Sequence, residues 1–271
     1  MSKKTHKSKK LNKRRMVLRE SKSPSKNRVK ITLADKLDEI YNSTVCLDTT
    51  CKGSILCCKT ACPQMNFSEY SALIHEIWNS ISKSEKLDMI CKSIEYFFKN
   101  DFSKFKQEIF IKPCMLLSKE GKCRWYEQRC LSCRMFGIWP ESIYTSRVDK
   151  FEKAYAGLLK REELPLNKQC PYVKRVDDSV PLTNEVINSL YKQLDELDKK
   201  VGNFSDLQVE QKENYRTFHD WLLYSTFGEQ WLIDLTNFAI SASKEIIEDQ
   251  MCATKKAIVD VFSKDMPDLG K

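Results

Sequence analysis

Glycine and proline are scarce in this sequence, with seven glycines and eight prolines in 271 residues. This scarcity argues against a turn-rich β-sandwich, because such folds join many short strands through Gly- and Pro-rich turns. Lys, Glu, Leu, Ile and Ser dominate instead, and this composition favours a mainly α-helical protein. Only three histidines are present, and neither His75 nor His219 has a partner at i+4 that would form a metal-binding pair.

Several sequence signals of location and catalysis are also missing. No stretch approaches the roughly 18 apolar residues of a membrane span, and no apolar segment of a secretory signal follows the basic N-terminus. We therefore expect a protein of the reducing cytoplasm without membrane contact. The sequence has no Walker loop, no GxGxxG, no GxSxG and no Cys-x3-Cys-x2-Cys radical-SAM motif, so no catalytic residue can be named.

Cysteine, by contrast, is abundant, with twelve residues of which ten are clustered. In a reducing compartment, clustered cysteines are more often metal ligands or redox groups than disulfides. The remaining two, Cys91 and Cys252, lie in predicted helices and are interpreted as small buried hydrophobic residues. The ten candidate ligands are Cys46, Cys51, Cys57, Cys58, Cys62, Cys114, Cys123, Cys130, Cys133 and Cys170.

The number and spacing of these cysteines bear on the identity of the metal. Thiolates select zinc, copper(I) or iron–sulfur clusters. A zinc site closes with four ligands, and a [4Fe–4S] or [2Fe–2S] cluster also takes four cysteines, so ten could serve two sites. Because neighbouring side chains diverge, we expect the Cys57–Cys58 pair to fit a cage of several metal atoms better than one ion. The favoured prediction is one or two iron–sulfur clusters of the [4Fe–4S] type, with zinc as the alternative.

The second cysteine block resembles a known signature. It opens with Cys114 and continues as GKCRWYEQRCLSCRMF over residues 121–136, which resembles the YkgJ-type cysteine-cluster proteins, described as zinc- or iron-chelating domains. The resemblance covers about residues 46–140 and implies that Cys114, Cys123 and Cys133 are ligands. The first block is spaced more widely than in that family, Cys130 stands where proline is common there, and Gly137 replaces the proline after Phe136. The flagellin lysine-methylase family is a more distant comparison.

Charged and aromatic residues accompany the second block. Arg129 and Arg134 flank candidate ligands and are expected to offset the negative charge of a thiolate-bound cluster. Trp125 and Tyr126, together with Phe136 and Trp139, are expected to form a dry wall around it. The alternative is that the aromatics are ordinary core residues and that Arg129 pairs with Glu127 or another acid.

The chain is predicted to have three regions. Residues 1–30 hold thirteen Lys and Arg and one acid, Glu20, and are expected to be disordered when free. This tail is either a polyanion- or RNA-binding arm or a solubilising segment. Residues 31–175 form the cysteine-rich domain, and residues 176–271 form a helical extension packed on it. The nucleic-acid candidates in the tail are Lys9, Lys10, Lys13, Arg14 and Arg15.

Apolar periodicity predicts where the helices lie. In the cysteine-rich domain we expect a lead-in helix over 31–45 and two inserts over 68–82 and 84–99, the second with a Ser82–Glu85 capping box. In the C-terminal region, one helix should run from Thr183 to Gly202 and a second should contain Tyr215 and Trp221. A third should begin near Trp231 and extend towards Ile247, and a last one should cover 252–263. The predicted fold class is therefore mainly α, with irregular cysteine-rich metal-binding loops, helical inserts and a C-terminal helical extension.

Three functions remain open at this stage. The first is an iron–sulfur protein that transfers electrons with a redox partner, or a cluster-dependent redox or modification enzyme. The second is a zinc-stabilised module that binds RNA or a ribonucleoprotein through its basic tail. The third is a protein that stores or delivers iron.

Overall fold

The structure is a computed structural model. It describes residues 32–43, 45, 47–51, 56–60, 62–106, 113–154, 160, 162, 170 and 173–264. The predicted basic tail and Cys46 lie outside these residues. The part of the chain that begins at Thr32 forms one compact unit.

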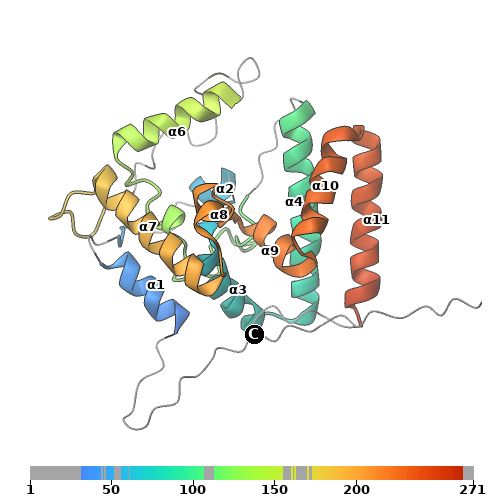
Figure 1. Cartoon of the computed structure of the whole chain (residues 1–271), viewed down its shortest axis with the longest axis horizontal. Helices are drawn as coiled ribbons and strands as arrows, with labels where there is room; N and C mark the ends of the chain where they lie inside the picture. Colours follow the sequence, from blue (N-terminus) through green and yellow to red (C-terminus); the bar gives the residue numbers. More distant parts are fainter. Residues whose placement is uncertain are drawn as a thin grey trace, which may run out of the picture. The chain divides into compact units, whose positions relative to one another are not determined.

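The fold is mainly α-helical, as predicted. The described residues form eleven helices and one two-stranded sheet (Figure 1). None of these helices is both long enough and apolar enough to cross a lipid bilayer. The helices are α1 (Leu33–Tyr41), α2 (Leu56–Thr60), α3 (Phe67–Ser80), α4 (Lys83–Lys106), α5 (Leu131–Arg134), α6 (Glu141–Ala154), α7 (Asn184–Val201), α8 (Asp206–Glu210), α9 (Phe218–Phe227), α10 (Glu229–Ser241) and α11 (Lys244–Phe262).

Capping residues set two helix boundaries where the sequence predicts them. Helix α7 begins after Thr183, whose hydroxyl accepts from the Val186 amide, and ends at Gly202. Before α4, the Glu85 carboxylate accepts from the Ser82 amide at 2.9 Å, and the Ser82 hydroxyl accepts in return from the Glu85 amide. This reciprocal capping box stabilises the first turn of the helix.

The helices of the C-terminal region differ from the prediction at one junction. Helix α10 ends at Ser241 and does not continue to Ile247, because Ala242 adopts an extended backbone conformation with ψ of 155°. Ile247 therefore lies in α11, which begins at Lys244, eight residues earlier than expected.

The small sheet was not predicted. Strand β1 (Gln64–Asn66) pairs antiparallel with β2 (Tyr215–Thr217), with Met65 opposite Arg216. Tyr215 is therefore in a strand and not in a helix. Each strand ends at the N-cap of a helix, Asn66 before α3 and Thr217 before α9. The sheet thus fixes two helix starts that are about 150 residues apart in the sequence.

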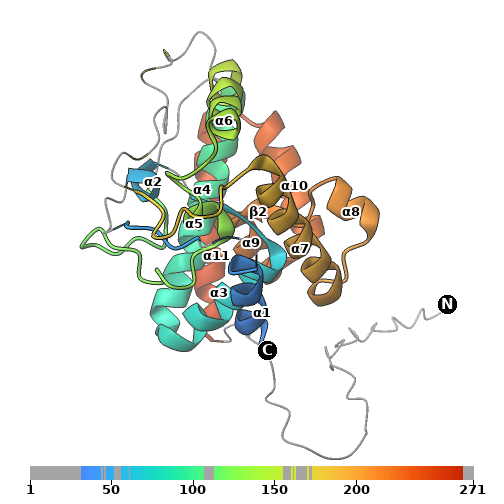
Figure 2. The ribbon, with the colours of Figure 1, turned by 90° about the vertical axis from the view of Figure 1, so that its left-hand side faces the viewer.

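Two hydrophobic cores flank helix α3. The first core is formed by α3, α4, α9, α10 and α11 and contains fully buried Trp221 and Phe98. The second is formed by α1, α5 and α7 and contains Leu131, Leu190 and Leu194. Figure 1 shows α4, α10 and α11 side by side, with α1 and α7 on the other side of α3. Figure 1 shows the short helix α2, which carries Cys57 and Cys58, between these two groups, and Figure 2 shows α2 and α5 from another side.

Candidate metal centre

Seven candidate cysteines from three segments lie near enough to one another for their thiols to shift one another's pKa values. The first segment is α2 and the residues after it, the second is the loop from 114 to 123, and the third is the turn into α5. Two close sulfur pairs lie within segments: the Sγ atoms of Cys57 and Cys58 are 3.8 Å apart, and those of Cys130 and Cys133 are 3.6 Å apart. The seven are Cys57, Cys58, Cys62, Cys114, Cys123, Cys130 and Cys133.

A third pair joins the first two segments. The nearby side chain of Cys62 is the largest cause of the raised pKa of the Cys114 thiol. The backbones of the same segments also touch, since the Cys114 amide donates to the Cys58 carbonyl at 2.5 Å. The 3.8 Å separation of their Sγ atoms corrects the expectation that the side chains of Cys57 and Cys58 diverge.

Short-range backbone bonds hold the two later segments in shape. In the 114–123 loop, Leu117 and Cys123 form an isolated antiparallel bridge, and the Ser118 amide donates to the Lys122 carbonyl at 2.7 Å. Gly121 completes this tight turn with φ of 75°, which glycine adopts without strain. In the third segment, Cys130 is the N-cap of α5, which places Cys133 one turn away.

The pKa values of the thiols show that burial and neighbouring sulfurs oppose their joint ionisation. Hydrogen bonding from the Cys58 thiol lowers the pKa of Cys57 to about 7, and nearby Arg129 contributes in the same direction. The pKa of Cys58 is raised by its bond to Cys57 and by burial. The pKa values of Cys114 and Cys133 are raised well above the ordinary value by their sulfur partners and by burial. Full ionisation of these thiols therefore requires a compensating cation, and a metal centre supplies one.

The two arginines lie beside the thiols in different roles. The guanidinium of Arg129 stacks on the ring of Tyr126, 3.4 Å from its centroid, and favours the ionised forms of Cys57 and Cys123. Arg134 instead fastens the loop: its guanidinium donates to the backbone carbonyl of Arg129 at 2.9 Å. Its second bond, at 2.8 Å, goes to the carbonyl of Glu127.

The predicted aromatic wall is divided between the two cores. Trp125 is buried in the first core and donates its indole N–H to Ser80 Oγ at 3.3 Å. Trp139 is buried in the second core, where Arg147 lies over its ring. Tyr126 is only part-buried and donates its hydroxyl to the Cys51 carbonyl at 2.9 Å. The aromatics therefore support the cysteine loops from two sides without enclosing one space.

Cys51 and Cys170 lie in segments that border the seven-cysteine group. The backbone around Thr49 bridges to Arg175, and the Thr50 amide donates to the Lys174 carbonyl at 2.8 Å. Cys170 is buried against Gly137, where an added Cβ would be 3.3 Å from the Cys170 Cβ. Of the remaining cysteines, Cys91 is part-buried against the first core, and Cys252 is exposed on α11.

The donor set fits a thiolate-ligated group in type and number, but its sulfurs are arranged in pairs. Among the described residues, no three or more His, Cys, Asp or Glu side chains are grouped closely enough to hold one metal ion. None of the eleven described cysteines is in a disulfide. The residues thus offer enough thiols for a metal centre without forming a closed single-ion site by themselves.

Sequence analysis missed two side chains next to this centre, Glu69 and Tyr41. Glu69 is 3% exposed on α3 and accepts from the Leu131 amide at the start of α5 at 2.6 Å. Tyr41, at the end of α1, donates to the same carboxylate at 2.7 Å. The only sequence signal is the spacing Asn66-x2-Glu69, which is typical of a capping box and gives no hint of the longer-range bonds.

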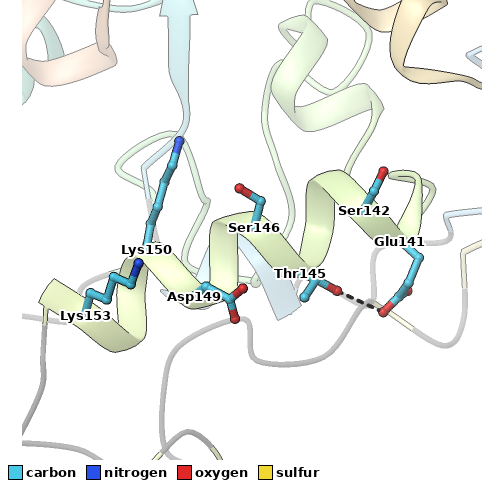
Figure 3. A pocket seen from close by; sticks show the side chains of 7 residues that line it. All are labelled: Glu141, Ser142, Thr145, Ser146, Asp149, Lys150 and Lys153. Atoms are coloured by element: carbon cyan, nitrogen blue, oxygen red, sulfur yellow. Dashed lines mark hydrogen bonds between the residues drawn. The ribbon is translucent and has the colours of Figure 1, made fainter.

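The hollow along α6 is a separate feature. Figure 3 shows it lined by side chains of that helix alone, with Glu141 at one end and Lys150 and Lys153 at the other. Thr145 donates to the Glu141 carboxylate at 3.2 Å. Because none of its lining residues is a candidate ligand, the hollow is not part of the metal centre.

Comparisons with protein-family models, with curated proteins and with solved structures find no match to this chain, so its resemblance to the YkgJ-type proteins stays a prediction from its own residues.

Proposed function

We propose that the chain is a cysteine-ligated metal-cluster protein of the iron–sulfur type, most simply with a [4Fe–4S] cluster. The observation that carries this proposal is the proximity of seven thiols from three segments, which shift one another's pKa values and lie near Arg129. Sulfur pairs from separate segments suit a cage in which each sulfur reaches a different metal atom. A single ion would instead need four sulfurs around one point.

This proposal assigns a role in the metal centre to each group of residues. The seven grouped cysteines are the ligands that we expect first, and Cys46, Cys51 and Cys170 are candidates for a second site. When bound, an iron–sulfur cluster supplies one-electron transfer or, with an open iron, Lewis-acid chemistry. Arg129 would offset the cluster's negative charge, and Arg134 would hold the loop that carries it. Electron transfer with a protein redox partner and redox modification of a substrate are both compatible with this arrangement. We place the protein in the reducing cytoplasm, where thiolates stay unoxidised.

Anaerobic purification tests the proposal directly. We expect a brown protein with about four or eight irons and matching sulfide per chain. Cys114→Ser should lower the iron content, while Cys252→Ser, which changes an exposed cysteine far along α11, should not. A colourless protein without iron after anaerobic purification and reconstitution would rule the proposal out.

A zinc-stabilised RNA-binding module is the second candidate, and two observations favour it. A tetrahedral Zn–S bond of about 2.3 Å sets neighbouring sulfurs about 3.8 Å apart, close to the 3.8 and 3.6 Å of the two measured pairs. The thirteen Lys and Arg of residues 1–30 would contact the phosphates. Zinc without iron in the purified protein would favour this candidate.

Deleting residues 2–30 tests the RNA arm of that candidate. Binding to a single-stranded RNA should weaken strongly, and the slope of log affinity against log salt should become shallower by about 0.7 for each lost phosphate contact. An unchanged affinity and slope would exclude the tail as the binding element. Storage or delivery of iron, the third candidate, would appear as readily exchangeable iron without sulfide.

A further inference from the structure

We propose that Glu69 is a positioning residue that holds the Cys130–Cys133 turn in the shape in which it binds metal. The proposal deepens the metal-centre function and rests on it. Its starting point is that Glu69 lies on α3, outside both cysteine blocks, and is nevertheless bonded to the first residue of α5. That residue, Leu131, lies between the two cysteines.

The contacts of the Glu69 carboxylate join three separate parts of the chain. Its Oε1 accepts from the Leu131 amide at 2.6 Å and from the Tyr41 hydroxyl at 2.7 Å. Its Oε2 accepts from the amide of Asn66 at 2.9 Å. All three partners are hydrogen-bond donors, and an ionised carboxylate has only acceptor atoms, so each donor meets an acceptor. Charge-assisted bonds of this kind are roughly twice as strong as neutral ones.

Helix capping alone does not account for this arrangement. A capping-box glutamate at this position needs only the bond to the N-cap amide, here Asn66. The bond to Leu131 spans 62 residues and satisfies an amide that has no partner within α5. Leu131 is fully buried, so an unpaired amide there would carry the full cost of desolvation. Glu69 is therefore the group that allows this cysteine turn to be buried.

A second buried carboxylate, that of Asp198, holds the first turn of α3, which carries Glu69. Asp198 of α7 accepts from the Ser68 amide at 2.7 Å and from the Phe67 amide at 3.2 Å, at the start of α3. It also accepts from the side-chain amides of Asn66 and Asn214 at 2.9 and 2.8 Å. The C-terminal helices thus hold the start of α3, α3 holds the turn into α5, and the turn sets the sulfurs of its two cysteines. None of these bonds needs a metal ion.

Glu69→Gln is the informative substitution. The side chain keeps its size but loses its charge. Its NH2 group must face the backbone amide of either Leu131 or Asn66, so the bond to Leu131 is either lost or no longer charge-assisted. Tyr41→Phe is the matched control, because it removes a donor from the same Oε1 and leaves the Leu131 bond in place. Both variants are made in the full-length protein, and circular dichroism checks that each is folded.

Metal affinity is the first measurement, by competition for cobalt(II) or zinc(II) against a chromophoric chelator. We expect Glu69→Gln to bind about 10- to 100-fold more weakly, the range seen when groups that orient ligands are changed. Its sulfur-to-cobalt charge-transfer band should also be weaker at saturation, which a loss of stability alone would not cause. Tyr41→Phe should retain the band. Equal affinity and equal spectra in wild type and Glu69→Gln would overturn the proposal.

Amide hydrogen exchange in the metal-free protein is the second measurement, and it separates this proposal from the proposed function. Exchange at Leu131 should accelerate in Glu69→Gln and stay slow in Tyr41→Phe. If wild type takes up neither cobalt, zinc nor iron, the metal function fails, and exchange at Leu131 still decides whether Glu69 holds the turn. Should Glu69→Gln not fold, Glu69→Asp replaces it, since that side chain keeps the charge but is too short to reach both amides.

Discussion

At the scale of single residues, the surroundings of the cysteines shift the pKa values of their thiols in different directions. Cys57 is biased towards the thiolate, whereas burial and neighbouring sulfurs keep Cys58, Cys114 and Cys133 protonated in the metal-free protein. In the proposed metal centre, binding would therefore displace several protons. Ligation would begin at Cys57, because its pKa is lowered to about 7.

The reactivity of Cys57 is the prediction at this scale. In the reduced, metal-free protein, its alkylation by iodoacetamide should rise with pH through a midpoint near 7, because its pKa is lowered to about 7. An ordinary thiol has its midpoint near 8.5. Cys58→Ala, which removes the hydrogen bond that lowers the pKa of Cys57 most, should move the Cys57 midpoint upward. Peptide mapping by mass spectrometry at a series of pH values measures the midpoint in both proteins, and a wild-type Cys57 midpoint of about 8.5, as for an ordinary thiol, would contradict the prediction.

At this scale the sequence identified cysteine thiols as the candidate ligands, but it did not predict how their sulfur atoms are arranged. Clustering in the sequence selected ten candidate cysteines, and seven of those that the structure describes lie near one another. It could not foresee that Cys57 and Cys58 converge, because that depends on the local turn of α2. Nor could it find Glu69, since a buried carboxylate and a capping carboxylate look identical in a sequence.

At the scale of elements, one close approach ties the end of the second cysteine block to Cys170. Gly137 has φ of 91°, and a Cβ added there would lie 3.0 Å from the Val173 Cβ and 3.3 Å from the Cys170 Cβ. Glycine is therefore favoured at this position for two reasons: its φ is positive, and a Cβ would crowd Val173 and Cys170. The YkgJ-type pattern has proline at this position, but proline cannot adopt the positive φ that Gly137 has in this chain.

The comparison of Gly137→Ala with Gly228→Ala separates these two needs. Gly228 has nearly the same φ, 90°, but nothing within 4 Å of an added Cβ. We expect Gly228→Ala to cost about 1 kcal/mol from backbone strain alone. Gly137→Ala should cost about 1–3 kcal/mol more, because the methyl group also crowds its neighbours. Urea unfolding gives the free energy of unfolding of both variants. If both variants lose the same free energy, Cys170 and Val173 can move away from the added methyl group without destabilising the fold.

Helices were predictable because their stripes and caps are local in sequence, as for α4 and α7. The strands were not, since β1 and β2 are three residues each and their pairing is a long-range event. Tyr215 shows the consequence: it precedes a helical stripe and was assigned to it, but the helix begins only after Thr217. The split between α10 and α11 was missed because apolar residues continue across Ala242, where only the backbone conformation changes.

At the scale of the whole unit, the cysteine segments border two cores of packed apolar side chains. The first core buries large apolar side chains completely, among them Trp221, Phe98 and Ile77. Each such side chain contributes about 1.5–3 kcal/mol by its removal from water. The 114–123 loop contains few comparable residues, with Leu116 as its main buried anchor. Stability should therefore be distributed unevenly between the helices and the cysteine loops.

Metal removal tests this distribution. In protein stripped with a chelator under reducing conditions, amide exchange should accelerate in segments 57–64 and 113–136 and stay slow in α4 and α9. The helical circular dichroism signal should fall only slightly, because these helices are held by apolar packing. Small zinc domains behave differently, since they unfold entirely without their metal. A cooperative loss of all helices on stripping would mean that the thiol centre stabilises both cores, with α3 transmitting its effect to each of them. Acceleration confined to the cysteine segments would instead identify a preformed helical scaffold whose loops close around the metal.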